Sequence, residues 1–256
     1  MAVAADGDVY TTLELEHREF PQESKVPDRP DRQSAAALTV EFFREWNRGD
    51  QLLSGVFFGR VDSDDDERTH ADIRELSFVH AARDYEVRLG VRKVFWGVTE
   101  SRHLVDVINQ TDFVEDIDNE DKLGQPMINY THILDWGTVD LFVLPGFRER
   151  TFPGPSGRLR SIPSVDENAA IYESSAQERH VDLAVRWSHV LGNFDVGISH
   201  FWGTSREPVL SAGRSQSGLP VLVPHYDIIH QTGLELQAAL GEWLWKLEGI
   251  RRSGQG

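Results

Sequence analysis

Residues 85–94 read YEVRLGVRKV, and this short stretch decides the fold. Apolar and polar side chains alternate along it. The first set is Tyr85, Val87, Leu89 and Val91, and the second is Glu86, Arg88, Gly90 and Arg92. Successive side chains of a β-strand point to opposite faces, so the stretch predicts a strand with one apolar face and one charged face. A polar segment follows and ends in an acid-rich run, residues 112–121.

The same alternation recurs along the whole chain and predicts an all-β fold of about eleven strands. The predicted strands cover residues 8–20, 37–46, 51–61, 72–80, 85–94, 127–135, 138–146, 179–189, 194–204, 223–240 and 243–252. Residues 51–61 are rich in glycine, which leaves that one segment ambiguous. No segment shows a sustained helical period.

The connections between these segments alternate between long and tight. The long ones cover residues 21–36, the acidic stretch from Asp62, and residues 95–126, 147–178 and 205–222. The tight ones cover residues 47–50, 81–84, 136–137, 191–193 and 241–242. An up-and-down meander places all tight turns at one end of the sheet, whereas Greek-key crossings would break this order.

The composition excludes several classes of protein. The chain carries 42 acidic and 26 basic residues, a net charge of −16, which disfavours a nucleic-acid partner held through its phosphates. It has no cysteine, so neither a disulfide framework nor a thiolate metal site is available. No apolar run approaches the roughly 18 residues that a transmembrane helix needs.

Aromatic residues lie toward the ends of the predicted strands. They are Trp46, Tyr85, Trp136, Trp187, Trp202, Tyr226 and Trp243. A single tryptophan in such a place is usually a core residue, but rings repeated at strand ends are typical of the belts at membrane–water interfaces. Strands of about ten residues, when tilted, also match the thickness of a hydrocarbon core.

Two segments, LPGFRER at residues 144–150 and FWGTSRE at residues 201–207, look like the strand-to-loop exits of large proteobacterial barrels. With the strand pattern, the chain resembles bacterial outer-membrane β-barrels of the porin or substrate-channel kind. The resemblance implies an up-and-down antiparallel transmembrane β-barrel in the bacterial outer membrane, with lipid and small hydrophilic solutes as partners. Residues 1–256 would form one barrel domain, and residues 95–126 would be the third long outer loop, folded inward to narrow the pore. Since such barrels usually have an even strand number, the odd count leads us to expect the N-terminal part of a larger barrel.

The charged faces of the predicted strands would then line a water-filled lumen, where acid and arginine rows act on the permeant. We expect the lining residues to be Glu86, Arg88, Arg92, Glu100, Arg102, His103, Asp106, Asp182 and Arg186. We expect no catalytic residues, no metal ligands and no cofactor.

Two alternatives remain open at this point. One is a soluble periplasmic all-β protein that binds a ligand and buries its apolar faces in a core. The other is an outer-membrane enzyme acting on lipid, for which Ser199 and His200 are poor candidates because neighbouring strand residues face opposite ways. The acids at 62, 64 and 66 have the spacing of calcium-loop ligands, but Glu67 and Ile73 stand where that loop needs Gly and Glu.

Overall fold

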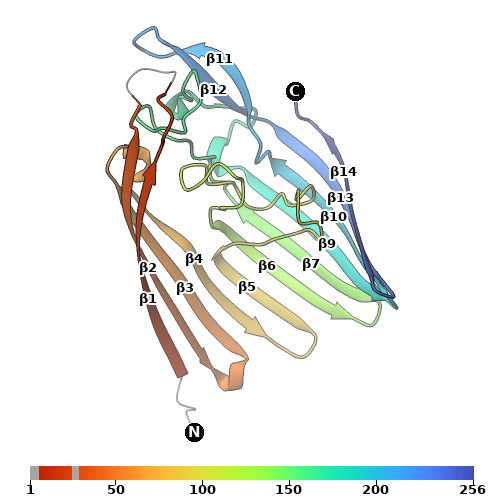
Figure 1. Cartoon of the computed structure of the whole chain (residues 1–256). Coiled ribbons are helices and arrows are strands. Elements are labelled where there is room, and N and C mark those ends of the chain that lie inside the picture. The colour runs from red at the N-terminus through yellow and green to blue at the C-terminus, as the bar shows by residue number, and fades with distance from the viewer. Residues whose placement is uncertain (1–5, 25–28) are drawn as a thin grey trace.

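The computed structural model describes residues 6–24 and 29–256, and its regular secondary structure is almost entirely β-strand. Eleven of them form one antiparallel sheet that curves around a central segment (Figure 1). In spatial order they are β1 (Asp6–Glu19), β2 (Arg32–Trp46), β3 (Gln51–Asp62), β4 (His70–Ala81), β5 (Tyr85–Arg92), β6 (Gln125–Leu134), β7 (Gly137–Pro145), β9 (Val181–Leu191), β10 (Phe194–Thr204), β13 (Ile228–Leu240) and β14 (Trp243–Ser253). The predicted all-β class and antiparallel meander are confirmed.

Helical structure in the described residues is limited to four short 3-10 turns. They are η1 (Asn47–Gly49), η2 (Asp66–Arg68), η3 (Glu167–Ala169) and η4 (Gln177–Arg179). No helix in this part of the chain is long and apolar enough to cross a membrane.

Several predicted assignments were wrong. Strand β2 begins at Arg32, inside the segment predicted to be a loop, because Gln33, Ala35 and Ala37 continue its buried face. The predicted strand 223–240 is two strands, since β12 (Pro220–Tyr226) ends before β13 begins. The predicted loop 205–222 contains β11 (Val209–Arg214), which pairs with β12, while β8 (Ile171–Tyr172) completes a separate three-stranded sheet. Alternation continues across the bend and therefore could not locate it.

The pairing register fixes which side chains share a face of the large sheet. We call the face toward residues 93–124 the inner face and the opposite one the outer face. Every strand places an exposed apolar residue on the outer face, each 39–68% exposed: Leu13, Leu38, Phe57, Ile73, Leu89, Ile128, Leu141, Leu183, Ile198, Leu234 and Leu247. Among the described side chains, Glu19 is the only carboxylate that the register places on this face. The acids and arginines of the strands lie mainly on the inner face.

Strands β1 and β14 form the two edges of the sheet. In the described residues β1 pairs only with β2, and β14 only with β13. Because all neighbours are antiparallel and the sheet has eleven strands, β1 and β14 run in the same direction.

Candidate functional site on the inner face

The segment between β5 and β6, residues 93–124, folds back onto the inner face, and we call it the inner segment (Figure 1). Its apolar side chains pack against those of five strands. The contacting group is Trp96, Val105, Val107 and Ile108 from the segment with Met127, Phe142, Leu144, Ala184, Phe201 and Ile229 from the strands. Because these side chains are buried against one another, the segment is a packed part of the fold.

One end of the inner segment is held by a single carboxylate on β14. Oε1 of Glu248 accepts hydrogen bonds from the backbone N–H groups of Val98 (2.7 Å) and Thr99 (2.9 Å). Its Oε2 accepts from those of Leu104 (2.8 Å) and Val105 (3.4 Å). Glu248 is only 8% exposed, so water competes little for these charge-assisted bonds.

The other end of the inner segment is held by three arginines from β3, η2 and β4. The contacts are Arg60 Nη2 to Glu115 Oε2 (2.8 Å), Arg74 Nη1 to Asp112 Oδ2 (2.7 Å) and Arg68 Nε to the Val114 carbonyl (3.0 Å). All three arginine side chains are less than a tenth exposed. The inner segment is therefore fastened to both halves of the curved sheet.

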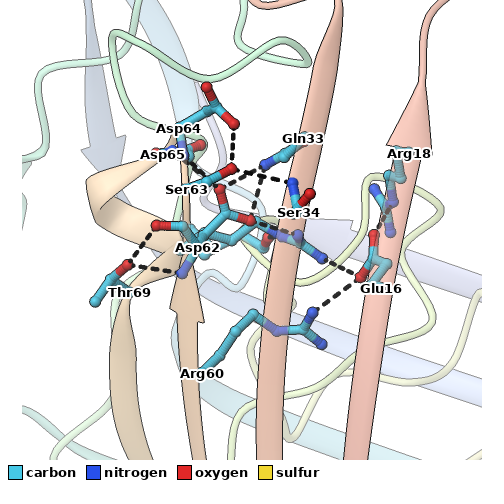
Figure 2. Close-up of polar contacts among 12 residues, drawn as sticks. Glu16, Arg18, Gln33, Ser34, Arg60, Asp62, Ser63, Asp64, Asp65 and Thr69 are labelled. Atoms are coloured by element: carbon cyan, nitrogen blue, oxygen red, sulfur yellow. Dashed lines mark hydrogen bonds and ion pairs between the residues drawn. The ribbon is translucent and has the colours of Figure 1, made fainter.

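Figure 2 shows the network of acids and arginines behind these contacts. Glu16 on β1 pairs with Arg60 (2.9 Å) and Arg68 (3.1 Å). The fully buried carboxylate of Asp62 pairs with Arg68 (2.9 Å) and accepts from Gln33 Nε2 (2.9 Å) and from the backbone N–H of Asp64 (3.0 Å). The first acid with calcium-loop spacing is thus already committed to an arginine, and the network serves to join β1–β4 to the inner segment.

Three of the predicted lining residues form a partly exposed group on β5. Arg88 Nη1 donates to Thr131 Oγ1 (2.8 Å) and Asn129 Oδ1 (3.2 Å), and its guanidinium pairs with Glu86. Arg92 Nη1 donates to the same Asn129 oxygen (3.3 Å), and no described carboxylate forms an ion pair with it. Arg92 is therefore a cationic group that amide oxygen alone holds in place.

Arg186 on β9 lies on the inner face nearer the tight turns. Its guanidinium makes a two-pronged contact with Glu235 on β13, at 2.7 and 3.2 Å. Both line an open cavity of about 410 Å³ together with Val98, Thr138, Ser188, Asp195 and Gly197. The cavity lies between the inner segment, through Val98, and strands β7, β9, β10 and β13.

Three predicted residues lie on the surface of the inner segment. Glu100 has an 87% exposed side chain and pairs with Lys246 on β14 (2.5 Å). Arg102 is exposed as well. His103 is partly buried and meets the ring of Phe95 edge-on, with ring centres 4.7 Å apart.

The other two predicted residues are buried. Asp106 has a 2% exposed side chain 3.5 Å from Lys122, and burial raises the pKa of its carboxyl group. Asp182 is fully buried and pairs with Arg206 (2.8 Å) and His180 (2.7 Å). The prediction that these two carboxylates meet a permeant does not fit their burial. Alternation placed Asp182 on the correct face but could not show what covers it.

One cluster in the described residues has the composition of a metal site. Donor atoms of His70, Asp112 and Glu115 lie within 4.8 Å of one another. However, Arg74 Nη1 lies 2.7 Å from Asp112 and Arg74 Nη2 lies 3.6 Å from Glu115. The guanidinium already supplies the positive charge that these two carboxylates need, so the arrangement favours an ion-pair network over a metal ion.

Two unusual acids lie in the segment that follows β7. Burial raises the pKa of Glu149 to about 7, and the nearby charge of Glu178 acts in the same direction. Burial also raises the pKa of Glu167 to about 7, although its Oε1 accepts a hydrogen bond from the backbone of Phe152 (2.8 Å). These groups lie outside the large sheet and change charge near neutral pH.

Sequence reasoning missed two groups that contact the inner segment: Glu248, and Arg206, whose Nε donates to the Ile108 carbonyl (3.0 Å). Alternation assigns Glu248 to the charged face of its strand, but nothing local distinguishes it from the many other acids. Arg206 was noticed only within a segment resembling a strand exit. Comparisons with protein-family models, with curated proteins and with solved structures found no match. Function is therefore inferred from the geometry of this chain.

Proposed function

We propose that this chain forms the wall of a bacterial outer-membrane channel that passes small hydrophilic solutes. The observation that carries the proposal is the opposite chemistry of the two faces of one eleven-stranded sheet. The outer face carries an exposed apolar residue on every strand, whereas the inner face carries acids, arginines and a packed inner segment.

The exposed apolar residues of the outer face favour a lipid environment. Burying one leucine-sized side chain is worth about 1.5–3 kcal/mol, so a water-exposed apolar residue on each strand sacrifices a large total. Proteins that stay in water rarely expose a contiguous apolar patch of more than a few hundred Å². Lipid chains would cover this face, because the backbone groups beneath it are already paired within the sheet. A sandwich that buried its apolar faces would instead need a second layer over them.

The inner face supplies a polar path. Arg88, Arg92 and Arg186 face the space inside the curve, and the inner segment crosses that space between its two anchors. Charged groups that line a water-filled path set its ion preference. In this proposal the inner segment narrows the path, and Glu100, Arg102 and His103 lie at its surface.

Closure of the wall places a requirement on the edges. A lipid-exposed edge strand would leave its backbone groups unpaired in hydrocarbon. Since β1 and β14 run in the same direction, direct pairing between them would be parallel, whereas barrels of this kind are antiparallel throughout. The proposal therefore requires a partner strand of opposite direction at each edge.

The proposal is tested by reconstitution of the chain in planar bilayers and in lipid vesicles. Insertion should shift the tryptophan emission to shorter wavelength, and single-channel steps should appear. If the chain stays soluble without detergent and its tryptophan emission does not change when vesicles are added, the membrane assignment is contradicted. Insertion without conductance would contradict the channel alone.

The ion preference gives a second test. The pair Arg88→Gln and Arg92→Gln removes two positive charges from the path, so the reversal potential in a salt gradient should shift toward cations. Arg83→Gln, in the tight turn between β4 and β5, is the matched control and should leave it unchanged. If the reversal potential shifts equally in the double variant and in Arg83→Gln, the assignment of Arg88 and Arg92 to the solute path is refuted.

A further inference from the structure

The outer face carries histidines where acids are almost absent. The register places six of the ten histidines there: His17, His80, His132, His189, His200 and His230. In a chain with 42 acidic residues, a face with one described carboxylate and six imidazoles is strongly biased toward groups that gain positive charge. This bias is not needed for an apolar lipid contact, so it points to a second role.

Three of these histidines repeat one arrangement at the end of the sheet that carries the tight turns. Each lies beside an aromatic ring on one of three successive tight hairpins, β4–β5, β6–β7 and β9–β10. The ring centres are 6.2 Å apart for His80 and Tyr85, 6.0 Å for His132 and Tyr130, and 6.0 Å for His189 and Trp187. We call these three histidines the histidine belt.

The pairing register places no carboxylate directly opposite a belt histidine, and His189 also lines the cavity that contains Asp195 and Glu235. Across the register, His80 lies opposite Gln51 and Val87, His132 opposite Tyr85 and Val139, and His189 opposite Val196. The titratable groups beside it are the tyrosines Tyr85 and Tyr130. The charged residues of the adjacent turns are Asp50, Arg83, Asp84 and Asp135, and the His189 hairpin also carries Arg186 and Asp195. The Tyr130 hydroxyl lies 3.1 Å from His132 Nδ1, which leaves Nε2 for an outside partner.

The belt also lies at a suitable depth. On β13, ten residues separate His230 near the long loops from Leu240 at the tight turn. These ten residues span about 33 Å along the strand. With the strand tilted by about 40° from the membrane normal, this corresponds to a height of about 25 Å, which equals the apolar band of outer-membrane barrels. Residues at the turn end would therefore lie at the level of lipid headgroups.

We propose that His80, His132 and His189 bind the phosphate groups of anionic phospholipids when their imidazoles are protonated. The inference rests on the proposed membrane location and names the lipid class that this surface selects. The flanking rings hold the interface position, and histidine is the side-chain type that gains positive charge in mildly acidic conditions. Binding to anionic lipid therefore strengthens in mildly acidic conditions.

The experiment uses the full chain in vesicles of brominated lipid, with the native tryptophans as reporters. The quantity measured is the relative affinity for brominated phosphatidylglycerol over brominated phosphatidylcholine, from fluorescence quenching at pH 7.5 and 5.5. One positive charge near an anionic surface is worth about a fivefold preference, so this ratio should rise by up to about fivefold at the lower pH. The triple variant His80→Gln, His132→Gln, His189→Gln should lose the rise.

Two further measurements keep the outcome decisive. His225→Gln, on β12 outside the large sheet, is the control and should keep the rise. The single variant His189→Gln, beside the Trp187 reporter, should reduce the rise even if the triple variant fails to insert. The proposed role of the histidine belt is refuted if the affinity ratio in the native chain does not change with pH, or if the ratio still rises in the triple variant. If the histidine belt is overturned but brominated phosphatidylcholine still quenches the tryptophan fluorescence, the membrane location stands. If neither lipid quenches it, both the lipid-binding proposal and the membrane location are refuted.

Discussion

Replacement of Glu248 by alanine should release the end of the inner segment nearest β14. The carboxylate accepts four backbone N–H bonds, three of them at 2.9 Å or shorter. Bonds to charged groups contribute about 1.5–3 kcal/mol each, and the freed amides recover part of this from water. A net loss of about 1 kcal/mol per short bond gives about 3 kcal/mol, or roughly a hundredfold change in the ratio of released to anchored segment.

Limited trypsin digestion measures this release. The exposed Arg102 lies between the anchored residues Thr99 and Leu104, so cleavage after it requires local release of the segment. We expect cleavage about a hundredfold faster in Glu248→Ala, in proportion to the released population. The control is Glu100→Ala, which removes an exposed ion pair on the same side and should change the rate little. A rate in Glu248→Ala close to that of the control would refute the anchoring role.

Three other outcomes follow from the contacts. Arg206→Met leaves the buried carboxylate of Asp182 without its main partner and should lower the free energy of unfolding by about 3–5 kcal/mol, measured by urea titration. The double variant Glu149→Gln, Glu167→Gln should flatten the pH dependence of stability. The pKa values of both glutamates, about 7, exceed the reference value of 4.5, so between these values the folded chain keeps protons that the unfolded chain loses. The urea midpoint of the native chain should therefore fall as the pH rises from about 4.5 past 7. Gly90→Ala should prevent normal pairing of β5 with β4, seen as lost β-sheet circular dichroism, because φ is 129° and a Cβ would lie 2.0 Å from a backbone oxygen of β4.

The sequence predicted the local features of this fold better than the contacts between distant segments. Alternation in residues 85–94 correctly assigned both faces of β5, since a period of two is fixed by backbone geometry alone. It failed at residues 220–226, where the same period continues into another sheet. It also could not show that Asp182 lies beneath covering segments, because that burial depends on residues far away in the chain.

The packing of the inner segment limits how a channel of this design could open. Moving the segment off the inner face would expose Val105 and Ile108, which are fully buried, and break the bonds to Glu248. The exposure alone opposes this motion by about 1.5–3 kcal/mol for each side chain. The arginine contacts at the other end add to that barrier. We therefore expect the inner segment to act as a fixed constriction, with changes in conductance confined to exposed side chains such as Glu100 and Arg102.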